Sequence, residues 1–218
     1  MTNATKKQAR KNEILRSAER IFAKKGFQDA TISEIAKKAK ISEASIYEYF
    51  STKEGLLFSV STKYASELFN LLDFHLKLIR GAGNKLRSII YLFLSSYEEH
   101  PDNAAIIMLI LKHNKKFLNT EGHLEIKKAL RIINKTIDEG VETGEFRDDI
   151  NVYLIRSIII GTMEHLVTNW LMTERPENLT DLVDPFVDNI LEGIQSKEKT
   201  DNQSGIIKIQ LYENNKDD

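Results

Sequence analysis

Residues 31–54 read TISEIAKKAKISEASIYEYFSTKE, and this short stretch holds the signals for three helix starts. Thr31 stands three residues before Glu34, and Ser51 stands three residues before Glu54. This is the spacing of a capping box, in which the hydroxyl accepts a hydrogen bond from an unpaired backbone N–H while the Glu carboxylate reaches back to the first residue. The stretch therefore predicts short helices in close succession.

The middle of this stretch predicts a helix pair. We expect one helix over residues 33–39, a turn at residues 40–41, and a second helix over residues 43–50 that begins after Ser42. Two short helices joined by a tight turn form the helix-turn-helix arrangement, whose second helix enters the major groove of DNA. The pattern thus favours a DNA-binding function.

A longer helix is expected over residues 8–25, because apolar residues recur there at helical spacing. Gly26 suits the position just past the end of this helix, where a positive φ is common. Residues 1–7 are expected to form a disordered tail. The apolar residues of this helix and of the helix pair would form one small core, consisting of Ile14, Ala18, Ile21, Phe22, Phe27, Ile32, Ile35, Ala36, Ile41, Ile46 and Phe50.

Charge is distributed unevenly along the 218 residues, although the formal net charge is only −1. Residues 1–53 carry 12 Lys+Arg and 6 Asp+Glu, a net charge of +6, whereas the remainder carries 19 and 26, a net charge of −7. A basic first quarter on an acidic body is typical of a protein whose one end meets a polyanion. Charge alone would equally describe a solvated face, but together with the helix pair it favours nucleic acid.

Small and polar residues remain once the core is assigned, and we expect them to form the DNA interface. Small side chains at Ala44 and Ser45 would let the second helix approach base edges, with Ala44 against a thymine methyl group. The hydroxyls of Tyr47 and Tyr49 can reach phosphates. The predicted DNA-contacting residues are Thr31, Ser33, Ser42, Glu43, Ala44, Ser45, Tyr47, Tyr49 and Lys53.

Residues 9–57 resemble the DNA-binding domain of TetR-family transcriptional regulators. The family pattern is carried by Phe22, Gly26, Phe27, Thr31, Ile35-Ala36, Ile41-Ser42, Ile46-Tyr47, Phe50 and Lys53-Glu54-Gly55-Leu56. Two positions depart from it, since Lys40 stands where Gly is usual in the turn and Ala44 stands where Gly is common. A non-Gly residue at positive φ costs about 1 kcal/mol. The resemblance implies a regulator that binds a double-stranded DNA operator.

The rest of the chain has the apolar periodicity of helices. We expect them over residues 54–79, 85–99, 103–111, 125–142, 152–172 and 179–194, with residues 81–83 ending the first and residues 112–122 forming a loop or frayed helix. The expected fold class is all-α. Residues 1–53 would form an N-terminal three-helix DNA-binding domain, and residues 54–197 a C-terminal helical effector-binding and dimerisation domain. Residues 198–218 would be a tail, either disordered or forming a short strand.

The resemblance implies that the last two helices pair with their copies in a second subunit. Function also favours a homodimer, because two recognition helices about 34–36 Å apart match successive major grooves. The candidate interface residues lie on the apolar faces of these helices and are Ile158, Gly161, His165, Leu182, Phe186 and Ile190.

The resemblance also implies a cavity in the body for a small hydrophobic effector. Such a ligand changes DNA binding only through different affinities for the two arrangements of the protein. Arg156 would meet an anionic group of the ligand or form an ordinary salt bridge, and for each apolar candidate a place in the plain core is the favoured alternative. The candidate lining residues are Tyr91, Tyr97, Met108, Phe117, Arg156, Met163 and Trp170, with Phe69 beside them.

A second resemblance concerns the identity of the effector. Residues 161–170, with Gly161-Thr162-Met163-Glu164 and the later Thr168-Asn169-Trp170, are similar to the eighth helix of TetR-like repressors of fatty-acid degradation that respond to long-chain acyl-CoA. A regulator of multidrug efflux that senses aromatic or cationic compounds is the competing hypothesis. A helical partner-binding protein and an activator in place of a repressor are the remaining alternatives.

No catalytic site, metal or cofactor is predicted. Cys is absent, and none of the five His has a partner at the helical spacing of a metal pair. No Gly-rich phosphate loop occurs. The N-terminus lacks the apolar run of a secretory signal, and no stretch reaches the roughly 18 apolar residues of a membrane span. We therefore expect a cytoplasmic protein without a membrane partner.

Overall fold

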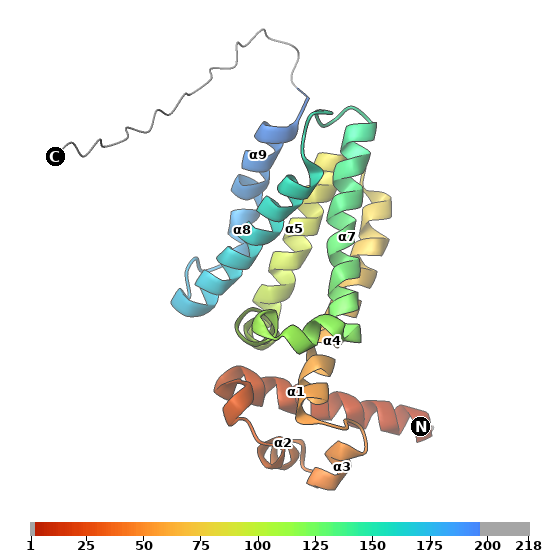
Figure 1. The fold of residues 1–218 in the computed structure, drawn as a ribbon, viewed down its shortest axis with the longest axis vertical. Coiled ribbons are helices and arrows are strands. Elements are labelled where there is room, and N and C mark those ends of the chain that lie inside the picture. Colours follow the sequence, from red (N-terminus) through yellow and green to blue (C-terminus); the bar gives the residue numbers. More distant parts are fainter. Residues whose placement is uncertain (1–2, 197–218) are drawn as a thin grey trace, which may run out of the picture.

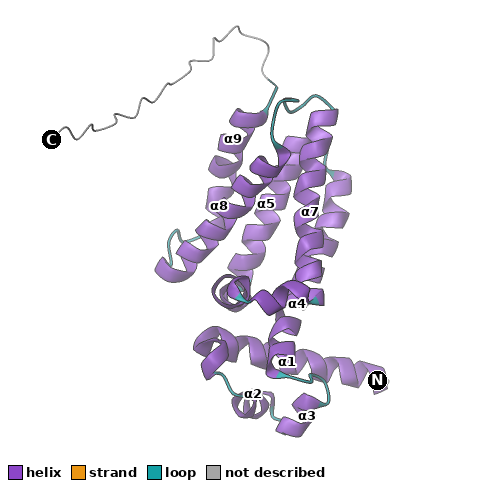
Figure 2. Cartoon of the chain, viewed as in Figure 1, coloured by secondary structure: helices purple, strands orange, loops and turns teal. Residues whose placement is uncertain are grey.

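The structure is a computed structural model that describes residues 3–196, and within that range the chain is helical (Figures 1 and 2). The helices are α1 (Asn3–Asp29), α2 (Ile32–Ala39), α3 (Glu43–Tyr47), α4 (Lys53–His75), α5 (Ala82–Glu99), α6 (Pro101–Ala105), α7 (Glu121–Glu142), α8 (Val152–Thr173) and α9 (Val183–Ile194). Short 3₁₀ segments occupy η1 (Leu76–Leu78), η3 (Leu111–His113), η4 (Lys115–Asn119) and η5 (Leu179–Leu182), and a π-helical turn forms η2 (Ile106–Ile110). The expected all-α fold class is confirmed. The tail predicted at residues 198–218 lies outside the described residues.

Two helical units are stacked along the long axis of the molecule (Figure 1). Helices α1–α3, which we call the head, lie at one end, and helices α4–α9, which we call the body, rise from it. Helix α4 passes from the head into the body, because it packs against α1 and also lies along α7. The two units therefore share one continuous helix.

Each unit has its own core. In the head, eight of the eleven residues predicted from the sequence are buried, and Ile21, Phe27 and Ile41 pack against them partly buried, so that prediction is confirmed. The body core is larger and draws on α4 through α9, with Leu86, Ile90, Ile133, Ile159 and Val187 among its buried members. Burial of this size is the main stabilising term for such a helical bundle.

Several predicted helix ends were wrong. Helix α1 begins at Asn3, within the stretch expected to be a tail, although Gly26 does end its regular part with a φ of 74°. Helix α3 ends at Tyr47 and not at residue 50. Helix α4 is capped by Thr52, whose hydroxyl accepts from the Gly55 N–H at 2.9 Å, and not by Ser51. The spacing of Ser51 and Glu54 favoured Ser51, but the adjacent Thr52 hydroxyl caps the helix although no Glu stands three residues after it.

The start of α5 was also misassigned, and a distant side chain explains why. Residues 81–83 were expected to end a helix, yet Ala82 and Gly83 open α5. Their N–H groups donate to the two carboxylate oxygens of Glu145, at 2.6 and 2.8 Å. A carboxylate at a helix N-terminus satisfies unpaired N–H groups and stabilises the helix dipole. Glu145 therefore caps α5 across the tertiary structure.

Residues 101–122 are helical but irregular. The expected helix over residues 103–111 is divided into α6 and the π-helical turn η2, which is followed by η3, η4 and an early start of α7 at Glu121. The expectation of deep burial holds for Ile106, Met108 and Leu111, whereas Leu109 is 46% exposed. Because a π-helical turn shifts the facing of side chains, the apolar run is divided between the core and the surface.

Gly140 allows a close approach between the end of α7 and the following loop. A Cβ atom at this position would lie 2.2 Å from Cδ2 of Phe146, whose side chain is fully buried. The Phe146 N–H also donates to the Gly140 carbonyl at 2.9 Å. The loop is therefore held against the helix by both backbone and ring contacts.

We predict that Gly140→Ala lowers the free energy of unfolding by about 2 kcal/mol or more, because the added methyl group would overlap the fully buried ring of Phe146. Urea unfolding at a fixed protein concentration measures this. Gly193→Ala is the matched control near the end of α9, where nothing lies within 4 Å of the added atom. Equal stability of the two variants would contradict the prediction.

Candidate nucleic-acid interface and effector cavity

A capping box fixes the start of α2, as the sequence predicts. The Thr31 hydroxyl accepts from the Glu34 N–H at 3.2 Å, and the Glu34 carboxylate accepts from the Thr31 N–H at 3.2 Å. Lys25, on α1, forms an ion pair with the same carboxylate and holds the pKa of Glu34 below its usual value. The first helix of the pair is thereby tied to α1.

The turn between the two helices depends on Lys40, which adopts a left-handed conformation with a φ of 55°. The Lys40 N–H donates to the Lys37 carbonyl at 3.2 Å, and the Ile41 N–H donates to the Ala36 carbonyl at 3.0 Å. These bonds close the C-terminus of α2. The sequence identified this position as one where Gly is usual, and the backbone has the conformation that favours Gly.

Helix α3 follows directly and presents small and polar side chains to solvent. Ser42 caps it, with its hydroxyl accepting from the Ser45 N–H at 3.1 Å and lying 2.9 Å from the Ser45 hydroxyl. Ile46 is fully buried and anchors the helix in the head core. The exposed surface of the helix consists of Ser42, Glu43, Ala44, Tyr47 and Glu48.

Of the remaining predicted DNA-contacting residues, Tyr49 and Lys53 have contacts within the head. Ser33 is exposed on α2. Tyr49 is partly buried and packs beside Phe50, with ring centroids 6.4 Å apart. Lys53 donates from Nζ to the Gln28 carbonyl at 3.2 Å and lies over the Phe27 ring, 4.6 Å from its centroid. Lys53 therefore joins the start of α4 to the end of α1.

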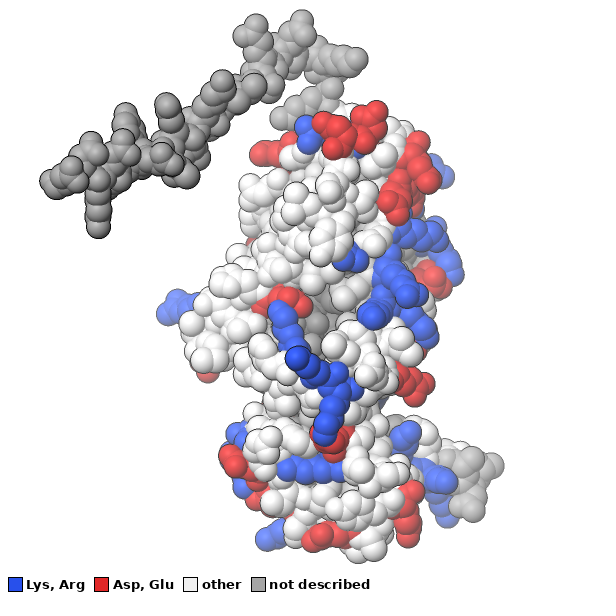
Figure 3. All heavy atoms as spheres, in the orientation of Figure 1, with Lys and Arg blue, Asp and Glu red and all other residues white. Residues whose placement is uncertain are grey.

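Several exposed cations of the head were not among the predicted contacts, and two of them lie close to α3. Lys37 and Lys38 lie in the last turn of α2, beside the turn that leads to α3. The signal that could have identified them is the charge of the first quarter of the chain. In the view of Figure 3, basic side chains on the head are interspersed with carboxylates, and acidic side chains gather at the opposite end of the body.

The body contains a small, partly open cavity of about 30 Å³ between α4, α5, α7 and the α6–η2 segment, which we call the internal cavity. Its lining carries no charged side chain and comprises Tyr64, Ala65, Leu68, Phe93, Ser96, Tyr97, Asn103, Ile107, Ile126 and Ala129. Asn103 is only 2% exposed, and its Oδ1 atom has no hydrogen-bond partner. A buried acceptor without a partner is uncommon in a native core, which makes this cavity the candidate effector site.

Tyr97 is the one predicted lining residue that borders this cavity. Met108 and Met163 are buried elsewhere in the body core, whereas Phe117 belongs to the head core and packs against Phe58 at 5.5 Å between centroids. Tyr91 is 49% exposed. Tyr64, Phe93 and Asn103 were missed, because their helices give no local sign of which faces meet around a cavity.

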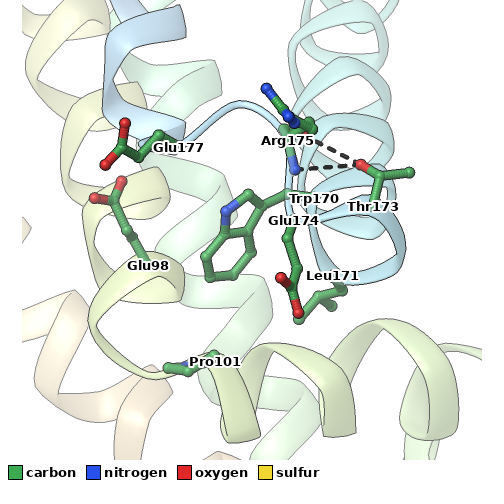
Figure 4. Close-up of a pocket in the computed structure, with 8 residues that line it drawn as sticks. All are labelled: Glu98, Pro101, Trp170, Leu171, Thr173, Glu174, Arg175 and Glu177. Atoms are coloured by element: carbon green, nitrogen blue, oxygen red, sulfur yellow. Dashed lines mark hydrogen bonds between the residues drawn. The ribbon is translucent and has the colours of Figure 1, made fainter.

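Trp170 and Arg156 lie apart from the internal cavity. Trp170 borders an open depression of about 850 Å³ at the end of α8, where Glu98, Glu174 and Glu177 surround its indole ring (Figure 4). The Arg156 guanidinium lies over the Tyr153 ring, 5.0 Å from its centroid, and the Nε atom is buried without a hydrogen-bond partner. The predicted lining residues are thus divided among several places.

The predicted interface residues share an accessible surface on α8 and α9. Ile158 is exposed, and a side chain added at Gly161 would meet nothing within 4 Å. His165 is exposed, and Leu182, Phe186 and Ile190 are partly exposed. Leu154 and Met172 extend the same surface along α8 and are more than half exposed. Large apolar side chains grouped in this way are typical of a surface that another chain covers.

Comparison with known proteins covers both units. Residues 14–60 match the family described as bacterial regulatory proteins of the tetR family, and residues 65–193 match the family described as the C-terminal region of YsiA-like proteins. The chain belongs to the TetR family. It is therefore a DNA-binding transcriptional regulator with a helix-turn-helix head and a ligand-binding body.

Among its TetR-family relatives, the chain is 26% identical over 185 residues to the fatty acid metabolism regulator protein of Bacillus subtilis, covering 85% of this chain and 95% of that protein. It is 31% identical over 144 residues to the repressor NicS of Pseudomonas putida, covering 64% and 67% of the two chains. The structure of FadR from Bacillus subtilis in complex with stearoyl-CoA aligns with a TM-score of 0.75 at 27% identity, over 84% of this chain and 98% of that one. These relatives are transcriptional regulators.

Two further kinds of site were sought in the described part of the chain. No group of three or more His, Asp or Glu side chains there is arranged to hold a metal ion. None of the helices described combines the length and the apolar character needed to cross a membrane.

We predict that Lys40→Gly stabilises the protein by about 0.5–1 kcal/mol, because relief of the left-handed backbone outweighs the extra freedom of Gly in the unfolded chain. Lys38→Gly, within α2 and equally exposed, should instead destabilise by about 1 kcal/mol. Urea midpoints measure both. A destabilised Lys40→Gly variant would show that the Lys40 side chain contributes more than its backbone costs.

Proposed function

We propose that this protein is a homodimeric repressor that leaves a palindromic operator when a long-chain acyl-CoA binds to the body. The observation that carries the proposal is the similarity over both units to FadR, a protein known in complex with stearoyl-CoA. The uncharged lining of the internal cavity supports an acyl chain as the group that enters it. We also propose a cytoplasmic location, where operator DNA is found, and no enzymatic activity.

The cavity sets a condition on this proposal. A volume of about 30 Å³ is far too small for a long acyl chain, so the chain enters only if the lining helices separate. The favourable term is burial of the apolar chain, about 25 cal/mol for each Å² removed from water. The charged nucleotide part of the ligand would remain at the surface, because the lining offers it no compensating charge.

DNA binding would use the surface of α3 together with the helix ends around it. In a dimer formed through α8 and α9, the two heads would bring their α3 helices to successive major grooves. Tyr47 is 51% exposed on α3, and its hydroxyl is the group that we expect to bond a phosphate. The Lys and Arg residues of the head would supply the salt-dependent part of the affinity.

We predict that Tyr47→Phe weakens operator binding about tenfold, since a hydrogen bond to a charged phosphate is removed. The slope of affinity against salt concentration should not change, because a tyrosine hydroxyl releases no counterion. Fluorescence anisotropy with the upstream promoter DNA at two salt concentrations measures both. Tyr91→Phe is the matched control, since Tyr91 is similarly exposed but lies on the body. Equal affinities of the two variants would remove Tyr47 from the interface.

We predict that stearoyl-CoA releases the wild-type protein from its operator, while free CoA, which has no acyl chain, does not. The same anisotropy assay with bound DNA measures the release, and calorimetry of the protein with each compound measures binding. Release by free CoA at equal concentration would contradict a site built around the acyl chain.

The depression at Trp170 supports a second candidate effector class. An aromatic face bordered by the carboxylates of Glu98, Glu174 and Glu177, with Arg175 as the one cation in the lining, favours an organic cation (Figure 4). This depression is open, and Glu98 is engaged by the Thr180 N–H at 3.0 Å. If stearoyl-CoA neither binds nor releases DNA, a panel of quaternary ammonium compounds is the next measurement, and release by one of them would favour regulation by cationic compounds.

A further inference from the structure

The side chain of Tyr64 contacts both the internal cavity and the head. It lies on α4, and its ring forms part of the wall of the internal cavity. Its hydroxyl donates to Oε2 of Glu19 on α1 at 2.9 Å, a contact between residues 45 positions apart. The cavity is in the body and Glu19 is in the head, so one side chain joins the two units.

The buried carboxylate of Glu19 is stabilised by this hydrogen bond. The residue is 8% exposed in the head, and burial raises the pKa of its carboxyl group. Within residues 3–196 the Tyr64 hydroxyl is the hydrogen-bond donor that the structure gives to this carboxylate. A buried carboxylate that loses its donor is destabilised, because its desolvation cost is then offset only by the nearby side chains of Lys63 and His100. The arrangement of head and body shown here is therefore favoured by the Tyr64 bond.

The ring of Tyr64 has little freedom to move without affecting this bond. It packs against His100, at the corner between α5 and α6, with ring centroids 4.7 Å apart. Lys63 lies over the same ring, with Nζ 5.3 Å from its centroid. Because the cavity has a volume of only about 30 Å³, an acyl chain that enters it displaces its walls. Displacement of Tyr64 would draw its hydroxyl away from Glu19.

We propose that Tyr64 couples occupancy of the internal cavity to the position of the DNA-binding head through its hydrogen bond to Glu19. This inference rests on the proposed function, because it names how the effector site acts on the operator site. A ligand that displaces Tyr64 binds more tightly to the arrangement in which the Glu19 bond is broken. DNA binding and ligand binding then oppose one another by a single coupling free energy, which is reciprocal.

The first test needs no effector. Ala129, on α7, lines the cavity and is 2% exposed. The larger side chain of Ala129→Leu would therefore fill the cavity without any ligand. We expect this substitution to weaken operator binding about tenfold in the wild-type background and less than about threefold in the Tyr64→Phe background. Anisotropy at one salt concentration measures the four affinities. An equal loss in both backgrounds, or no loss in either, would overturn the proposal.

Matched controls separate coupling from general damage. Tyr97→Phe removes a hydroxyl from the same cavity lining, and the full tenfold effect of Ala129→Leu should persist in that background. Glu19→Gln combined with Tyr64→Phe removes the charge left without a donor, and should bind DNA as Tyr64→Phe does or better. Circular dichroism checks folding, and Ala129→Val replaces Ala129→Leu if the larger side chain unfolds the body.

Stearoyl-CoA then separates this inference from the proposed function. If calorimetry detects no binding to the wild-type protein, the acyl-CoA proposal fails, while the affinities of the Ala129→Leu variants still decide the coupling role of Tyr64. If stearoyl-CoA binds, we expect Tyr64→Phe to retain that binding. The factor by which stearoyl-CoA weakens DNA binding should be about tenfold smaller in this variant than in the wild-type protein. Unchanged release of DNA from Tyr64→Phe would overturn the inference and leave the acyl-CoA proposal standing.

Discussion

Helix α4 is buried in two cores, and the rest of the structure depends on this constraint. Its first turns place Leu56, Leu57 and Val60 in the head core, and further along the same helix Leu72 lies in the body core. A helix of 23 residues is a rod about 35 Å long. Because both ends of the rod are packed, a change in its direction within the body is carried to the head, and no flexible linker absorbs the motion.

A second connection runs through the irregular segment from α6 to η4. Ile106, Leu111 and Phe117 are buried in the head core, whereas Ala104 and Met108 are buried in the body core. The π-helical turn at residues 106–110 makes this division possible, because it changes which side chains face each unit. At the surface, an ion pair of 3.1 Å between Lys116 on η4 and Glu54 on α4 joins this segment to the start of α4. The head is thus connected to the body by α4 and by the α6–η4 segment, and residues of both connections border the internal cavity.

The head was largely predictable from sequence because its signals are local. The capping box at Thr31, the cap at Ser42 and the unusual Lys40 are all readable within ten residues, and the structure places each as expected. The body was less predictable because its decisive contacts are distant. The start of α5 depends on Glu145, more than sixty residues away, and Phe117 lies in the head core although it was predicted to line the effector cavity. Whether Tyr64 and Asn103 border a cavity depends on how four segments meet, and no periodicity in one segment contains that information.

Regulation by a ligand requires that the ligand distinguish two arrangements of the protein, since equal affinity for both shifts nothing. A body with a large empty pocket would meet this requirement only if the pocket closed or opened with the head. The cavity described here offers a direct route to that difference, because Tyr64, Ala65 and Leu68 all lie on α4 and form part of its wall. The same helix begins at the head with Thr52 and Lys53 set against the end of α1. A ligand that displaces this part of α4 therefore acts on the helix that also positions the head, and its affinity would differ between the two arrangements of the protein.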